Sequence, residues 1–161
     1  MMKHLLCRPA AAWVGISALL MSAMLFPQSS NALIPSTTAV ITNSGSTNTI
    51  GYRIYVTPSG TVNYVTGIGA GHNRIPRSLT TKFFRDIRAA MPLSQLPTIA
   101  CVKSASFGTS TFITFGGSRS PDVSCAGRNE RTQVLNRDVE AIVRTLSIGN
   151  VPKSQGKALQ T

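Results

Sequence analysis

The clearest pattern in this chain of 161 residues is an alternation of apolar and polar positions between residues 52 and 66. It continues on both sides of a Pro-Ser-Gly turn at residues 58–60, which is the signal of a β-hairpin. The apolar face of the first strand holds Tyr52, Ile54 and Val56, and the opposite face holds Arg53, Tyr55 and Thr57. We therefore expect one face of this hairpin to be buried and Tyr55 to share the exposed face with Arg53.

The stretch 109–120 predicts a second hairpin. Its alternating sets are Thr109, Thr111, Ile113 and Phe115 on one face and Ser110, Phe112 and Thr114 on the other. Gly116-Gly117 suits a tight turn at positive φ, and the return strand should be short because Pro121 cannot donate to a ladder. Residues 37–42 and 98–103 are candidate short strands, and the second of these would deliver Cys101.

Two later stretches carry apolar residues at the spacing of an amphipathic helix. The first follows Ser78, a candidate N-cap, and ends before Pro92. The second runs from about Glu130 to Ile148, with Gly149 as its terminator. Their apolar faces hold Leu79, Phe83, Phe84, Ile87, Ala90 and Met91 in the first helix, and Val134, Leu135, Val139, Ile142, Val143 and Leu146 in the second.

These elements follow one another in the order β-ββ-α-ββ-α. Such an order predicts an α+β fold, in which an antiparallel sheet of two β-hairpins plus a candidate N-terminal strand packs both helices on one face. We interpret residues 67–73 (GIGAGHN) as a flexible loop between the first hairpin and the first helix. Its glycines stand at every second position, without the spacing of a phosphate-binding loop.

The two ends of the chain predict an exported protein. Residues 1–32 combine a basic start, an apolar run and small residues before the end, which is typical of a secretory signal peptide cleaved between Ala32 and Leu33. An uncleaved membrane anchor is the alternative. Cleavage would remove two basic residues, lower the net charge from +11 to +9, and leave one periplasmic or secreted domain over residues 33–149. The polar tail, 150–161, is expected to be disordered.

Cys101 and Cys125 would be the two cysteines of the mature chain. In an exported protein such a pair predicts a disulfide bond, and two separately buried thiols are the alternative. In the chain-entropy model, this bond would stabilise the fold by about 3 kcal/mol. We expect no metal and no cofactor, because His72 is the only other soft ligand in the mature chain.

The same histidine, His72, is the only candidate general base. A Ser-His-Asp arrangement also needs an activated nucleophile, and neither Ser110 nor Ser118 lies in a G-x-S-x-G motif. Asp122 fits a turn whose side chain bonds nearby backbone, and we interpret the other four acids as surface or helix-end residues. The sequence therefore argues against an enzyme, and a hydrolase using His72 is a minor alternative.

A cluster of basic residues is the candidate binding site. It consists of Arg74, Arg77, Lys82, Arg85 and Arg88, from the predicted loop through the first helix. If they share a surface, they would attract phosphates, anionic polysaccharide or lipid headgroups; a merely solvated helix face is the alternative. A nucleic-acid partner is disfavoured, because single-strand binders interleave aromatic platforms with basic residues and only Tyr55 fits that role here.

Three segments carry a resemblance to known sequences. They read TNSGSTNTIGYRIYVTPSGTVNY, RIPRSLTTKFFRDI and CVKSASFGTSTFITFGGSRSPDVSC. Together they resemble a family of small exported bacterial proteins without known activity, over about Thr42 to Leu146. The resemblance implies bacterial origin and export, but no ligand and no catalytic residue. The expected function is a non-enzymatic exported basic domain that binds an anionic cell-envelope component. A protein-binding or inhibitory module of the periplasm is the alternative.

Overall fold

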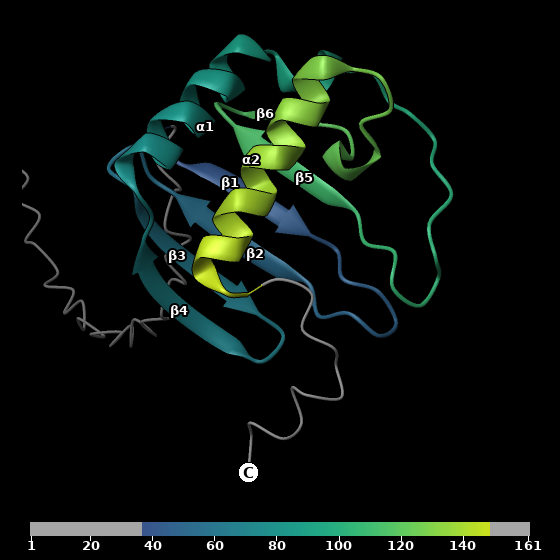
Figure 1. Ribbon diagram of the computed structural model, residues 1–161, viewed down its shortest axis with the longest axis horizontal. Helices are drawn as coiled ribbons and strands as arrows, with labels where there is room; N and C mark the ends of the chain where they lie inside the picture. Colours follow the sequence, from purple (N-terminus) through teal and green to yellow (C-terminus); the bar gives the residue numbers. More distant parts are fainter. Residues whose placement is uncertain (1–36, 149–161) are drawn as a thin grey trace, which may run out of the picture. The chain divides into compact units, whose positions relative to one another are not determined.

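The computed structural model describes residues 37–148, which form one antiparallel sheet with two helices against one of its faces (Figure 1). The strands are β1 (Ala39–Asn43), β2 (Tyr52–Val56), β3 (Thr61–Thr66), β4 (Gly69–Arg74), β5 (Thr111–Phe115) and β6 (Ser118–Arg119). The helices are α1 (Arg77–Ala89) and α2 (Glu130–Leu146), with 3₁₀ turns η1 (Leu93–Gln95) and η2 (Val123–Cys125). The predicted α+β fold, with both helices on one side of the sheet, is confirmed.

The structure describes neither end of the chain. The predicted signal peptide, its cleavage site at Ala32 and Leu33, and the predicted tail over residues 150–161 lie outside the described residues. Within residues 37–148, no helix is both long and apolar enough to cross a bilayer.

The strands are ordered β4-β3-β2-β1-β5-β6, and every neighbouring pair is antiparallel. The first predicted hairpin is β2 with β3, joined by a turn in which Gly60 has φ 84°, a value that costs glycine little. The second is β5 with the two-residue β6. β5 pairs with β1 and sets Ile113 opposite Ile41. The first and second hairpins therefore belong to one continuous sheet, with β1 near its centre.

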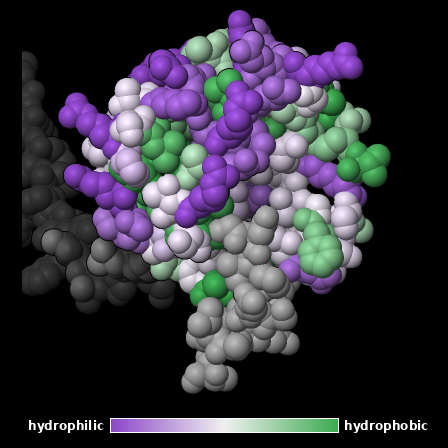
Figure 2. All heavy atoms as spheres, in the orientation of Figure 1, coloured by the Kyte–Doolittle hydropathy of each residue, from purple (hydrophilic) through white to green (hydrophobic). Residues whose placement is uncertain are grey.

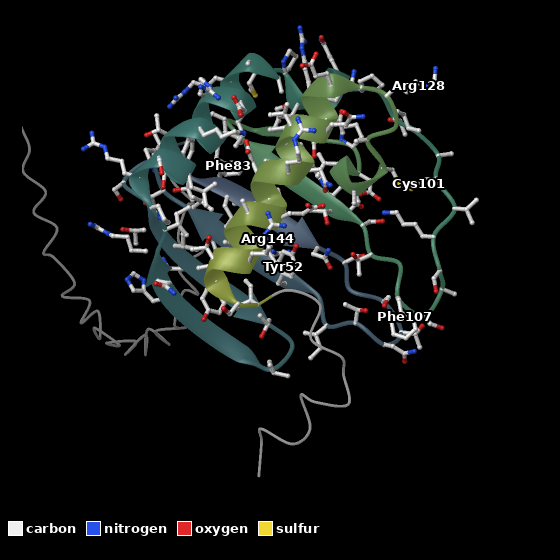
Figure 3. The ribbon with its side chains drawn as sticks, viewed as in Figure 1. Tyr52, Phe83, Cys101, Phe107, Arg128 and Arg144 are labelled. Atoms are coloured by element: carbon white, nitrogen blue, oxygen red, sulfur yellow. A yellow bond between two sulfur atoms is a disulfide. The ribbon has the colours of Figure 1, made fainter. Side chains whose placement is uncertain are left out.

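The core lies between the sheet and the helices. Each long central strand turns alternate residues toward this layer, and the sheet side contributes Ile41, Ile54, Val56, Val62 and Ile113, all at 0% exposure. Phe83 and Ile87 from α1 and Leu135 and Ile142 from α2 meet them, also at 0% exposure. Phe83 and Tyr52 are labelled within this layer in Figure 3. Burying each such side chain contributes about 1.5–3 kcal/mol, so the predicted apolar faces hold the two layers together.

The interpretation of residues 67–73 as a flexible loop is wrong. Most of this stretch forms β4, an edge strand whose six residues pair with β3 from Thr61↔Arg74 to Thr66↔Gly69. Glycine is a poor strand former in general, but packing explains why position 71 is a glycine. The Tyr64 ring lies where a Cβ at position 71 would stand. Gly71 therefore makes room for a neighbouring side chain.

Helix α1 does not start at the predicted cap. Ser78 lies inside the first turn, and Pro76 occupies the N-cap position without a side-chain hydrogen bond. The backbone N–H of Thr80 donates to the Pro76 carbonyl at 3.0 Å, and the Thr80 hydroxyl donates to the same oxygen at 3.1 Å. The fixed φ of proline prepares this start, so the prediction of Ser78 as N-cap is wrong.

Helix α2 has a side-chain cap at its first turn. Asn129 Oδ1 accepts hydrogen bonds from the Thr132 backbone N–H and hydroxyl, each at 2.9 Å. The helix ends at Leu146, and Ser147 follows in the left-handed conformation at φ 55°. It is therefore shorter than predicted, and the predicted terminator Gly149 lies outside the described residues.

Residues 98–103 are irregular, so the prediction of a short strand there is also wrong. Two side-chain links attach this segment to the fold instead. The predicted disulfide joins Cys101 to Cys125 with a Cα–Cα distance of 5.8 Å, and Cys101 is labelled on its loop in Figure 3. The Lys103 ammonium bonds the Asp122 carboxylate and the Ser124 hydroxyl.

Candidate binding surface on the open face of the sheet

The sheet has a second face that the helices do not cover (Figure 1). Strand residues that alternate with the core residues point to this side. We call it the open face, and its larger side chains are Val40, Thr42, Arg53, Tyr55, Asn63, Val65, His72, Arg74, Phe112, Thr114 and Arg119. Tyr55 and Arg53 share it, as the alternation predicts.

The strand register arranges these side chains in two rows across the sheet. One row runs His72, Asn63, Tyr55, Val40, Thr114 and Arg119, from β4 to β6. The neighbouring row runs Ala70, Val65, Arg53, Thr42 and Phe112. Adjacent strands lie about 4.8 Å apart, so the longer row spans roughly 24 Å.

Arg119 is fixed in place by an aromatic contact. Its guanidinium carbon lies 4.3 Å from the centroid of the Phe112 ring. A cation over an aromatic face at this distance gains about 0.5–1 kcal/mol at an exposed site. The guanidinium lies over the ring, and within residues 37–148 its N–H groups make no hydrogen bond, so they are available to donate to a ligand.

Two hollows lie side by side on the open face and share Thr42, Arg53 and Tyr55. The first, about 290 Å³, is lined by Val40, Thr42, Arg53, Tyr55, Thr114 and Arg119. The second, about 320 Å³, extends toward Val65 and the edge of Tyr52. Arg53 therefore stands at the boundary between both hollows, and Arg119 stands at the far wall of the first.

The acidic residues of the protein lie away from the open face. The acidic residues are Asp86 on α1, Asp122 between β6 and η2, and Glu130, Asp138 and Glu140 on α2. None lies on the open face, which carries Arg53, Arg74 and Arg119. Within residues 37–148, none of these three arginines has an ion-pair partner. The helix side, shown in Figure 2, also projects many hydrophilic side chains. There, cations and anions are mixed, as in the pairs that Lys82, Arg85 and Arg144 make with carboxylates.

The structure divides the predicted basic patch between two surfaces. Arg74 belongs to the open face, whereas the other four residues belong to α1 on the opposite side of the sheet. Lys82 bonds Asp86 at 2.8 Å and also Asp138, and Arg85 bonds Asp86 at 2.9 Å. Arg88 lies 5.8 Å from the Phe84 ring centroid. Two of the helix cations are thus already partnered by carboxylates.

The interpretation of the remaining acids as surface or helix-end residues is wrong for Asp138. Its side chain is only 3% exposed, and its carboxylate joins α2 to Lys82 on α1. Burial raises the pKa of Asp138 above its ordinary value despite the neighbouring ammonium. For Asp86, burial acts in the same direction, but hydrogen bonds from Arg85 and Lys82 outweigh it and hold the pKa of Asp86 below its usual value. This cluster connects the helices and does not face the open side.

His72 lies exposed on β4, on the open face. Its Nδ1 is 2.7 Å from Asn63 Oδ1, and because that oxygen accepts, Nδ1 carries the proton in this bond. The register places Asn63 beside it and no carboxylate or serine within the row. In the described part of the chain, no group of three His, Cys, Asp or Glu side chains is placed to hold a metal ion.

The sequence predicted only some of the residues of this site. The alternation in β2 places Arg53 and Tyr55 together on its exposed face. Phe112 falls on the polar face of β5 in the same kind of pattern, yet nothing in the sequence pairs it with Arg119. That pairing depends on the short return strand β6.

Comparison of the chain with protein-family models, curated proteins and solved structures finds no match. The arrangement of the open face is therefore the basis for the functional argument.

Proposed function

We propose that this domain is a non-enzymatic, exported binding module that attaches to an anionic polymer of the cell envelope through its open face. The supporting observation is the distribution of charge: three arginines that have no carboxylate partner within residues 37–148 share a face on which no acidic residue lies. Such a surface attracts anions over a distance and fits a partner of opposite charge.

The spacing of the arginines favours a polymer over a small anion. Arg74, Arg53 and Arg119 stand on β4, β2 and β6. In the observed strand order, Arg53 is two strands from Arg74 and three from Arg119, or about 10 and 14 Å at the usual strand spacing. One phosphate or carboxylate can reach only one such position, whereas a chain with repeated charges can contact all three.

A lipid surface fits this face less well. Val65, at 50% exposure, is its only exposed large hydrophobic side chain among the described residues. Three arginines attracted to anionic headgroups at about 1 kcal/mol each would give only weak binding without apolar insertion. The partner is therefore a hydrated polymer.

The Cys101–Cys125 disulfide supports the exported setting, because such bonds persist in oxidising compartments. Outside the cytoplasm, acidic polysaccharides of the envelope are abundant anionic polymers, and this module would hold the protein against them. Binding requires no chemical step, which agrees with the isolated position of His72.

Retention on immobilised heparin, used as a general polyanion, tests the proposal. The variant Arg53→Ala/Arg74→Ala/Arg119→Ala should elute at much lower salt than the unmodified protein. The matched control, Arg88→Ala/Arg137→Ala/Arg144→Ala, lowers the net charge equally on the helix side and should elute almost unchanged. Equal losses in both variants would show retention by net charge alone and contradict the proposal. Anionic vesicles in a parallel assay distinguish a lipid partner.

A further inference from the structure

Resting on that proposed function, we infer that the hollow between Arg53 and Arg119 binds one acidic sugar unit of the polymer, a pyranose ring that carries a carboxylate. The hollow lies where β2, β1, β5 and β6 pass side by side, and the strand register fixes its walls. Its volume of about 290 Å³ is close to the lower end of small-molecule sites. That size suits a single sugar ring.

Two arginines in the walls of the hollow could bind the carboxylate of the sugar. A guanidinium only donates hydrogen bonds, and its planar fork fits the two oxygens of a carboxylate. The contact with Phe112 holds the Arg119 guanidinium on the open face, where its N–H groups can reach a ligand. Arg53 stands across the hollow. A carboxylate at either wall would thus be met by a fork with no competing anion.

Neutral hydroxyl groups in the same hollow could bind the hydroxyls of the sugar. Thr42, Tyr55 and Thr114 line the same hollow, and their side-chain oxygens have no hydrogen-bond partner within residues 37–148. A hydroxyl both donates and accepts, as do the hydroxyls of a sugar ring. A phosphate or sulfate group can accept from these hydroxyls but has no proton to donate back to them, whereas the hydroxyls of a sugar ring do both. The mixture of forks and hydroxyls therefore points to a carboxylate-bearing sugar.

The aromatic residues argue against a nucleic acid in this position. Binders of single strands stack successive bases on open aromatic rings. On the open face, Arg119 covers one face of the Phe112 ring, and the other rings of the two rows are Tyr55 and the His72 imidazole, which stand two strands apart. One ring can support one sugar, but it cannot support a series of bases.

A charge-conserving variant tests the inference separately from the proposed function. Arg53→Lys/Arg119→Lys keeps every positive charge but removes both planar forks. Calorimetry with a tetragalacturonate should show binding by the unmodified protein, about tenfold weaker binding by this variant, and further weakening when Thr42→Val/Thr114→Val is added. Retention of the lysine variant on heparin should be unchanged, since it depends on the positive charges of the open face and not on the planar shape of the groups that carry them.

Three comparison ligands complete the experiment: a neutral maltotetraose, a short polyphosphate and a thymidine tetranucleotide. Tetragalacturonate should bind most tightly of the four. Equal or tighter binding of the polyphosphate or the tetranucleotide, or no response to the lysine and valine substitutions, would overturn the acidic-sugar assignment. Heparin retention that still depends on Arg53, Arg74 and Arg119 would then leave the proposed function standing. Unfolding curves of each variant confirm that the fold is intact.

Discussion

Arg119 on β6 stacks its guanidinium on the ring of Phe112 on β5, 4.3 Å from the ring centroid. The register pairs Arg119 with Thr114, so the arginine side chain leans diagonally across the strand to reach the ring. The contact fixes a cation on the one face of the sheet that lacks acidic residues. It thereby links the packing of a two-residue strand to the electrostatics of the candidate binding surface.

A double-mutant cycle should detect this contact. We expect Arg119→Ala and Phe112→Ala to show a coupling energy of about 0.5–1 kcal/mol in urea unfolding, as for exposed cation–π pairs. Arg53→Ala with Phe112→Ala is the matched control and should be additive, because within residues 37–148 Arg53 makes no cation–π contact. A coupling near zero in the first pair would mean that the stacking does not persist in solution.

Asp122 should make stability depend on acid pH. Burial disfavours its charge, but hydrogen bonds from Lys103, Ser124 and the Thr111 backbone N–H outweigh this and lower the pKa of Asp122 to about 2. Because the folded pKa lies below the unfolded value, the contribution is present above about pH 4 and is lost as the pH falls through 2. The difference amounts to about 2 kcal/mol.

Asp122→Asn should therefore lower the free energy of unfolding by about 2 kcal/mol near pH 6 and by much less near pH 2. Urea unfolding at both pH values measures this difference. Glu130→Gln, an exposed carboxyl at the start of α2, is the control and should change little. If Asp122→Asn lowers the free energy of unfolding by the same amount at both pH values, the role assigned to the carboxylate charge is wrong.

Lys82 should matter for stability because it partners the buried carboxylate of Asp138. Lys82→Met should cost about 2 kcal/mol near neutral pH, less than for a fully buried pair because Lys82 is half exposed. The folded pKa of Asp138 lies above its unfolded value, so ionisation of this carboxyl destabilises the fold. The loss of unfolding free energy in Lys82→Met should therefore grow as the pH rises. Adding Asp138→Asn should recover much of the loss. Arg85→Met, which leaves Asp138 paired, should cost far less in the same unfolding experiment.

Gly71 on β4 should not tolerate a side chain. The Tyr64 ring occupies the place of a Cβ at this position, so Gly71→Ala should cost about 1–3 kcal/mol through overpacking. Thermal or urea unfolding checks this value. In a Tyr64→Leu background the same substitution should cost much less, because the branched chain leaves space. An equal cost in both backgrounds would show that backbone conformation, and not the ring, restricts the position.

Local periodicity was sufficient to predict most of the fold. The alternation around Ile54 and Ile113 and the helical spacing of Phe83 and Leu135 identify the hairpins, the helices and their buried faces, because burial on one side imposes a period on the sequence. β4 was not predicted because none of its inward positions, Gly69, Gly71 and Asn73, is apolar in the sequence. The role of Gly71 depends on the Tyr64 ring of a neighbouring strand, which no local pattern reveals.

The candidate site was less predictable. A run of basic residues along α1 is conspicuous in the sequence, but the partners of Lys82 and Arg85 come from Asp138, more than fifty residues away, and from Asp86. The open face, by contrast, collects single arginines from three strands. Only the strand order brings Arg53 and Arg119 to one hollow.

The most direct test of the central claim is to map where an anionic polymer binds. Backbone amide resonances followed by NMR during titration with a heparin oligosaccharide should shift across the sheet from β4 to β6, with the largest changes near Arg53, Arg74 and Arg119. They should stay fixed along α1 and α2. Shifts concentrated along α1 around Lys82, Arg85 and Arg88, with the open face unaffected, would contradict the account.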